Sequence, residues 1–247
     1  MGSDLLKPLN LNSRASGSVP GGDSGDWGLA KTTTEHRIAE FLRERIIVGT
    51  FERGQKLKQA EIAGMLGVSI TPVREALRLL EAQGYVEVSA HRGAVVAPFV
   101  IEGAYELYQL RQLLEARLTV EAARKITRAE VDALKAINHD LLVAVNARDR
   151  RALQEKNFRF HFRFYEIAGQ PQTLDFVRVL WARYPLDMLS KMPGRPSRVF
   201  EEHAALLAAL EEGNTDAVAQ AMEAHIRTGW DEFCANYGTA SQTGAPA

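Results

Sequence analysis

Hydrophobic residues recur every three or four positions along most of the chain, which is the spacing of amphipathic helices. Between residues 34 and 98 this spacing predicts three helices, each with a glycine at its C-terminal end. Two short stretches of strand-forming residues come next and predict a hairpin. The helices are expected at 35–49, 59–67 and 69–84, and the strands at 85–88 and 94–99. The predicted order is helix, helix, turn, helix and β-hairpin.

From residue 101 to residue 237 the hydrophobic pattern is helical throughout. Thr127 and Glu130 have the spacing of a capping box, and Asp149 is placed to cap another helix. Gly169 and Gly213 are typical of helix C-terminal ends. The helices are expected at 102–126, 128–148, 150–168, 172–190, 198–212 and 215–236. Amphipathic helices joined by short loops favour an antiparallel bundle.

The two ends of the chain have a different composition. Glycine, serine, asparagine and proline are frequent in residues 1–30, so this segment buries too little apolar surface to fold, and we expect a flexible tail. A second flexible tail is expected at 238–247. Between the tails we expect a winged helix-turn-helix domain at 31–98 and an all-helical domain at 101–237. The predicted fold class is mostly α, with three helices and a small β-hairpin followed by an all-α antiparallel helical bundle.

Composition excludes several classes of protein. The 247 residues are 46% hydrophobic and 25% charged, which is typical of a globular chain rather than a disordered or fibrous one. A single cysteine, Cys234, excludes a disulfide framework and a cysteine-rich zinc site, and it fits a reducing compartment. No apolar run has the length of a membrane span and no secretory signal is recognisable. We therefore expect a cytoplasmic protein with no membrane partner.

The third predicted helix carries polar residues that suit DNA. A helix fits the major groove, where arginine can bind guanine with two hydrogen bonds and serine or threonine can bind bases or phosphates. The turn between the two strands adds a basic, flexible tip that could reach an adjacent groove. The candidate DNA-binding residues are Ser69, Thr71, Arg74, Arg78, His91, Arg92 and Gly93. The alternative is that Arg74 and Arg78 only form a solvated helix face.

Residues 54–99 strongly resemble the DNA-binding domain of GntR-type bacterial transcription regulators. The resemblance implies that Arg74, Ser69 and the turn at Arg92–Gly93 contact DNA. Ala60 departs from relatives that carry arginine there, so one familiar contact is expected to be missing. The residues that carry the resemblance are Gly54, Leu57, Ala63, Leu66, Gly67, Val68, Ser69, Pro72, Val73, Arg74, Ala76, Leu77, Leu80, Gly84 and Gly93.

Three histidines, His161, His203 and His225, fall on apolar faces of three different predicted helices. Asn157 lies four residues before His161, so the two side chains project from one side of a helix. If these faces meet in one core, the three imidazoles and the amide converge. A divalent metal such as Zn, Ni, Mn or Fe would account for several imidazoles in one core. The alternative is three separate core histidines, each with its own hydrogen bonds.

Residues 101–232 resemble the FCD ligand-binding domain of the FadR subfamily of GntR regulators. Metal-binding members use one aspartate, sometimes asparagine, and three histidines, which implies Asn157, His161, His203 and His225 as ligands. An amide oxygen attracts a cation less than a carboxylate does, so an open, cationic site is expected. Such a site suits a small organic acid, and Arg111 with Tyr108 could pair with its carboxylate. The alternative for Arg111 is a salt bridge with Glu115.

These observations predict a transcription regulator, most simply a repressor, which binds a palindromic double-stranded operator as a homodimer. A small-molecule effector would control its operator affinity through the helical domain. The alternative is a metal-dependent hydrolase or lyase that uses the three histidines. That alternative lacks an evident general base, because Asn157 cannot serve and Glu202 is expected to face solvent. A non-specific DNA binder is disfavoured by the net charge of −1.

Overall fold

The computed structural model describes residues 33–89, 93–186 and 190–237, so the predicted tails at 1–30 and 238–247 lie outside the described residues. The chain divides into two compact units. One contains the described residues before Arg45 together with Gly54–Val96. The other contains Arg45–Arg53 and the described residues from Ala97 onward. No described helix is long and apolar enough to cross a membrane.

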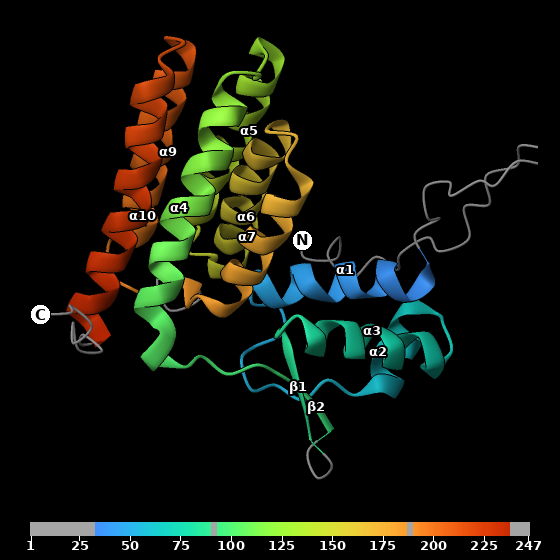
Figure 1. Cartoon of the computed structure of the whole chain (residues 1–247). Coiled ribbons are helices and arrows are strands. Elements are labelled where there is room, and N and C mark those ends of the chain that lie inside the picture. Colours follow the sequence, from blue (N-terminus) through green and yellow to red (C-terminus); the bar gives the residue numbers. More distant parts are fainter. Residues whose placement is uncertain (1–32, 90–92, 187–189, 238–247) are drawn as a thin grey trace, which may run out of the picture. The chain divides into compact units, whose positions relative to one another are not determined.

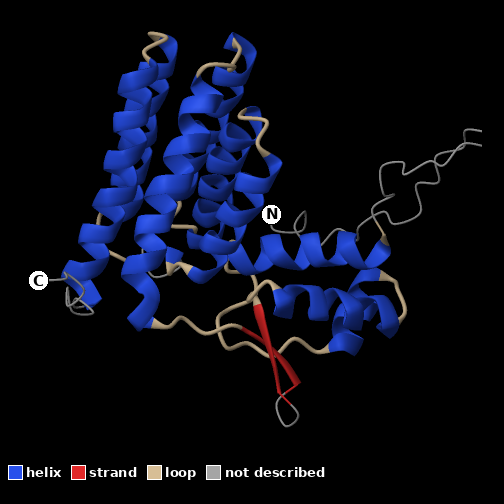
Figure 2. Ribbon diagram, viewed as in Figure 1, coloured by secondary structure: helices blue, strands red, loops and turns tan. Residues whose placement is uncertain are grey.

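The first unit has the predicted order of three helices and a hairpin (Figure 2). The strands pair antiparallel, with Val86 opposite Val96 and Ser89 opposite Gly93. The helices are α1 (Thr34–Ile47), α2 (Gln59–Leu66) and α3 (Ile70–Ala82), and the strands are β1 (Val86–Ser89) and β2 (Gly93–Val96). The structure therefore confirms the winged helix-turn-helix class, and α1 continues three residues into the second unit.

A short turn at Gly67 connects α2 to α3. Gly67 has a φ of 65°, a left-handed conformation that favours glycine, and its N–H group binds the last turn of α2. Ser69 is extended and precedes the first residue of α3, although its side chain makes no capping hydrogen bond. The buried face of α3 is formed by Val73, Ala76, Leu77 and Leu80. The opposite face, which is polar apart from the half-exposed Ile70, is therefore left to solvent.

The second unit is a helical bundle that follows a short 3-10 turn, η2 (Ile101–Gly103) (Figure 1). The capping box of Thr127 with Glu130 and the cap of Asp149 are both confirmed. The central packing pairs α10 with α4 and α9, and α5 with α6 and α9. The helices are α4 (Ala104–Ala123), α5 (Arg128–Asn146), α6 (Arg150–Ile167), α7 (Pro171–Arg183), α9 (Arg195–Glu211) and α10 (Thr215–Tyr237).

The helix expected at 102–126 is shorter in the structure, at Ala104–Ala123, and two predicted helix boundaries after α6 are wrong. The helix expected to reach residue 190 ends at Arg183, because Tyr184 precedes Pro185 and takes an extended backbone with ψ of 143°. The next helix begins at Arg195, three residues earlier than expected. Gly194 takes a left-handed φ of 74° and Pro196 lies in the first turn, which proline favours. The second correction changes the binding site, because it places Arg195 on α9.

Candidate functional site

The predicted DNA-binding residues on α3, and Ser69 directly before it, are all exposed. On α3 they are Thr71, Arg74 and Arg78. Gly93 begins β2 with a left-handed φ of 71°. His91 and Arg92 lie outside the described residues. The first unit thus presents an exposed helix face that is polar apart from the half-exposed Ile70, and this face stays a predicted DNA surface.

Glu75 lies next to both arginines of this face. Arg74 Nε is 3.4 Å and Arg78 Nη1 is 3.2 Å from the carboxylate of Glu75. Exposed ion pairs of this kind contribute about 0–1 kcal/mol, so a phosphate or a base can compete for both guanidinium groups. Glu75 therefore orients the arginines without immobilising them.

The structure brings the three predicted histidines together from three helices. His161 of α6, His203 of α9 and His225 of α10 are all buried. One ring nitrogen of each lies within 4.8 Å of the others. The Nε2 atoms of His161 and His203 are 3.1 Å apart. This spacing suits two ligands of one small cation.

Hydrogen bonds define which nitrogen of His161 carries the proton. The hydroxyl of Tyr165 donates its single proton to Glu115 Oε2 at 2.6 Å. Tyr165 keeps this proton because burial and the Glu115 charge raise its pKa well above the ordinary value. The phenolic oxygen, 3.1 Å from His161 Nδ1, therefore accepts, and His161 Nδ1 donates. The neutral ring then has a lone pair on Nε2.

The other two histidines have the same arrangement. Asn138 Nδ2 donates to the backbone oxygen of Phe200, so Asn138 Oδ1 faces His203 Nδ1, at 3.3 Å, and accepts from it. His225 Nδ1 donates to Glu202 Oε2 at 2.6 Å. Each histidine thus uses Nδ1 as a donor toward the protein, as metal-binding histidines do. All three Nε2 atoms are left as lone-pair donors.

Neither of the Nε2 atoms that meet between His161 and His203 therefore carries a proton, so two lone pairs face each other at 3.1 Å. Protonating the rings is unfavourable, because burial, followed by the charges of neighbouring basic groups, lowers the pKa of His161 and His203 well below the ordinary value. Burial also lowers the pKa of His225, against the opposing effect of Glu202. A cation bound by the lone pairs would relieve this repulsion. The donor chemistry therefore fits a divalent metal.

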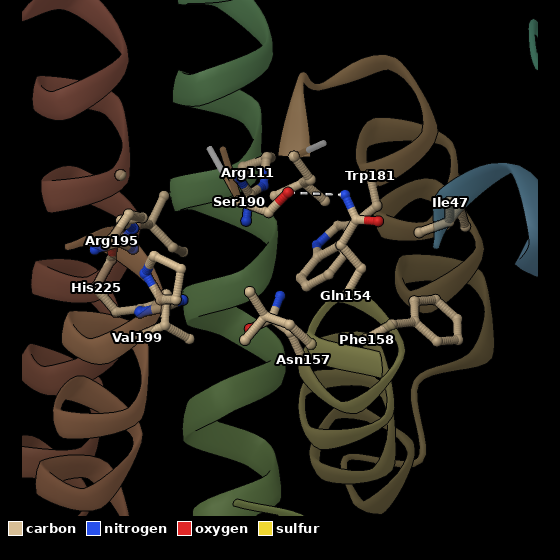
Figure 3. Close-up of a pocket in the computed structure, with 15 residues that line it drawn as sticks. Ile47, Arg111, Gln154, Asn157, Phe158, Trp181, Ser190, Arg195, Val199 and His225 are labelled. Carbon is tan, nitrogen blue, oxygen red and sulfur yellow. Dashed lines mark hydrogen bonds between the residues drawn. The ribbon is translucent and has the colours of Figure 1, made fainter. Parts of the chain in front are cut away.

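Asn157 supplies a further candidate ligand. Its Oδ1 atom is buried and has no hydrogen-bond partner among the described residues. A buried polar atom without a partner is costly, so such an atom calls for a ligand. Asn157 and His225 line the same cavity, which has a volume of about 60 Å³ (Figure 3). Three imidazole nitrogens and one amide oxygen form a donor set typical of a transition metal.

The cavity beside this cluster has two guanidinium groups in its wall. In Figure 3, Gln154, Asn157 and Phe158 lie on one side, and Arg195 and His225 on the other. Arg195 was missed in the sequence, because the predicted helix began after it. It lies seven residues before Glu202 on α9 and donates to that carboxylate at 2.8 Å. The sequence signal that could have found Arg195 is its spacing from Glu202, which places a basic and an acidic side chain on the same face of one helix.

Arg111 lines the cavity and also forms the salt bridge that we weighed as its alternative. Its Nε atom donates to Glu115 at 2.6 Å, and both side chains are buried. The guanidinium group also lies over the rings of Trp181 and Tyr184. Tyr108 is not among the residues that line the cavity, and its ring stacks on Trp230 at 5.0 Å. The position of the Tyr108 side chain therefore gives no support to its predicted contact with an effector carboxylate.

The expectation that Glu202 faces solvent is wrong. Its side chain is only 19% exposed and accepts hydrogen bonds from His225 and Arg195. Burial raises the pKa of Glu202, but the hydrogen bond and charge of His225, with Arg195, outweigh burial and lower it below the ordinary value. Glu202 is therefore a charged group that orients His225 and Arg195.

We expect the metal-free protein to lose stability as the pH falls from 7.5 to 5.5. The native rings of His161 and His203 stay neutral, whereas the unfolded chain binds protons near pH 6.5, so acid favours unfolding. Each ring contributes up to about 1.4 kcal/mol per pH unit below that pH. Urea titrations at three pH values measure the slope. His203→Gln should reduce the dependence of the unfolding free energy on pH, and the control His139→Gln, at an exposed position, should leave it unchanged. An unfolding free energy that does not change with pH would contradict buried, neutral rings at His161 and His203.

Comparisons with known proteins agree with the architecture. The model of "Bacterial regulatory proteins, gntR family" matches residues 34–96, and that of the "FCD domain" matches residues 106–228. The Uxu operon regulator of Haemophilus influenzae is 30% identical over 214 residues, which cover 78% of this chain and 79% of that protein. The Nta operon transcriptional regulator of Aminobacter aminovorans is 27% identical, with coverage of 74% and 86%.

A solved structure shares the fold. The structure described as E. coli McbR/YncC has a TM-score of 0.75 and 22% identity, and the match covers 83% of this chain and 99% of that chain. The comparisons give no support to the hydrolase or lyase alternative, because these relatives are named as regulators. From its two domains and its relatives, the chain belongs to the GntR family of transcription regulators, in the FadR-like subfamily that carries an FCD domain.

Proposed function

We propose that this regulator is a cytoplasmic repressor that binds a palindromic operator as a homodimer and responds to a small organic acid. The cavity lined by His225 and Asn157, beside the cluster of three histidines, is the observation that carries the effector proposal, and we call it the histidine-lined cavity. Two relatives are named as repressors, a probable D-xylose utilization operon repressor of Paenarthrobacter nicotinovorans and RspR of Escherichia coli. Two copies would place two α3 helices on two half-sites, as palindromic recognition requires.

The proposed metal is a divalent ion, Zn, Ni, Mn or Fe, held by His161, His203, His225 and Asn157. When bound, it supplies a positive charge that attracts a carboxylate. All four protein ligands are neutral, so they leave the charge of the ion uncompensated. The nearby arginines do not add net charge, because Arg111 and Arg195 are each paired with a glutamate. A small anion is therefore the ligand that the site should favour.

Regulation requires that the effector bind one arrangement of the chain better than another. The cavity wall includes Ile47, the last residue of α1. Because most of α1 belongs to the DNA-binding unit, an effector that repositions Ile47 would act on the helix that enters that unit. This supports a regulatory use of the cavity rather than a catalytic one. The well-held, charged Glu202 also makes a poor general base.

We expect untagged protein, purified without chelator, to contain about one divalent ion per chain. The physical reason is that one ring nitrogen of each histidine lies within 4.8 Å of the others, while the Asn157 oxygen, in the cavity that His225 also lines, is buried without a partner among the described residues. Elemental analysis measures the content, and chelation followed by return of each ion identifies the preferred metal. Protein that binds none of the four ions, even after return, would contradict the metal proposal.

Operator binding is tested by selection from a random duplex library. We expect enrichment of a two-fold symmetric sequence, and light scattering should give the mass of a dimer. A carboxylate added to the selected complex should then change the measured affinity. Enrichment of no sequence would contradict specific recognition, and a monomer bound to a single half-site would contradict the homodimer.

A further inference from the structure

The histidine-lined cavity adjoins a second, larger cavity. The second has a volume of about 480 Å³ and shares five lining residues with the first. The boundary includes a hydrogen bond of 3.0 Å from Gln154 Nε2 to Ser190 Oγ. The shared residues are Ile47, Gln154, Trp181, Leu186 and Ser190. Since one wall serves both spaces, a ligand that displaces this hydrogen bond can occupy both.

The size of the first cavity limits what it can hold alone. At about 60 Å³ it admits a few water-sized groups, such as a carboxylate with a neighbouring hydroxyl. Cavities for complete small-molecule ligands measure roughly 300–1,000 Å³. The second cavity, at about 480 Å³, falls within this range. An effector larger than a few atoms must therefore extend past Gln154 into the second cavity.

The second cavity is electropositive. Arg53, Arg150, Arg151 and Lys191 line it, whereas Glu52 is the single acidic residue among its described lining. Arg53 is part of the wall, because it donates to the backbone oxygens of Ala182 and Tyr184. Arg150 and Arg151 are exposed and occupy the first turn of the long helix α6. The N-terminus of α6 is already capped by the carboxylate of Asp149, which accepts from the Ala152 N–H group at 3.0 Å, so the basic side chains alone supply the positive charge of the cavity.

We propose that the effector carries two anionic groups: a carboxylate at the histidine cluster and a second anion held by Arg150 and Arg151. This inference rests on the proposed function, in which the histidine-lined cavity binds a carboxylate. The second anion is a phosphate or a carboxylate, since arginine binds either with paired hydrogen bonds. A linear acid with an anionic group at each end is the expected class, because its two ends must occupy adjoining cavities.

The test compares acids that differ only in the second anion. The probes are gluconate against 6-phosphogluconate, glycerate against 3-phosphoglycerate, and hexanoate against adipate. Isothermal titration of the metal-loaded full chain measures their affinities. We expect the acid with two anionic groups to bind about 10-fold or more tightly than its single-anion counterpart in at least one pair. Equal affinity within every pair would overturn the inference.

A matched pair of variants assigns the second anion to its place. Arg150→Ser with Arg151→Ser removes two charges from the cavity. Arg159→Ser with Arg163→Ser removes two exposed charges from the same helix outside both cavities. We expect the first variant to lose the preference for acids with two anionic groups and the second to keep it. An unchanged preference in the first, or an equal loss in both, would overturn the assignment to Arg150 and Arg151.

The same titrations separate this inference from the proposed function. If acids with one carboxylate bind and their binding requires His203, but a second anionic group adds no affinity, the carboxylate site stands and the two-anion inference fails. If no acid of the set binds, the carboxylate proposal itself fails, and the two-anion inference fails with it. Circular dichroism of each variant verifies that the helical bundle is retained.

Discussion

Arg74→Ala is expected to weaken operator binding by roughly 10- to 100-fold while the chain remains folded. Arg74 lies on the exposed face of α3, and its side chain is 51% exposed. Its Nε atom is 3.4 Å from the carboxylate of Glu75, so truncation breaks a weak surface ion pair. The loss should therefore appear in DNA binding rather than in stability. Fluorescence anisotropy with the selected operator measures the affinity, and thermal unfolding measures the fold.

The salt dependence of binding then identifies the kind of contact. If Arg74 binds phosphate, the variant should weaken binding to all sequences and reduce the salt slope by about one. If it binds a base, the variant should relax specificity at one operator position. Arg159→Ala, an exposed arginine of the second unit, is the control and should leave affinity unchanged. Full operator affinity in Arg74→Ala would mean that the arginine belongs to a solvated helix face.

His203→Ala is expected to abolish stoichiometric metal binding and the effector response while operator binding is retained. The Nε2 atom of His203 is 3.1 Å from that of His161, so truncation removes one ligand and relieves the repulsion that favours a cation. The imidazole also stacks on Phe160 with centroids 3.9 Å apart, and its loss leaves a cavity. His203→Gln, which fills more of that space, is therefore measured in parallel. Metal content and the effector-induced change in operator affinity are the readouts.

Asn157→Asp provides the opposite test at the same site. With a metal, a carboxylate in place of the unpartnered amide oxygen should tighten binding of the ion and raise the melting temperature of the loaded protein. In a purely structural core, a buried unpaired charge should only lower that temperature. If Asn157→Asp destabilises the protein equally with and without added metal, and His203→Ala keeps a full effector response, the cluster is structural.

Local interactions explain how much of the fold the sequence predicts. The left-handed Gly67 turn, the capping box at Thr127 and the cap at Asp149 involve residues within a few positions of one another, and all are present. The amphipathic spacing of α3 likewise separates its buried and exposed faces without reference to other elements. The end of α7 also depends on a local signal, because Pro185 is visible in the sequence. The prediction gave this proline less weight than the helical spacing of the hydrophobic residues around it.

The candidate site also has one part that the sequence predicts and one part that it does not. By itself, the sequence determined that three histidines and Asn157 lie on apolar helix faces, because side-chain direction follows from helical periodicity. Only the tertiary structure decided which nitrogen of each ring faces the others, since that depends on hydrogen bonds to Tyr165, Asn138 and Glu202. Two of these three partners lie on a different helix from the histidine that they bind, and the proton on Tyr165 is fixed by Glu115 of α4. Such contacts arise from how helices rotate and pack, which no local pattern encodes.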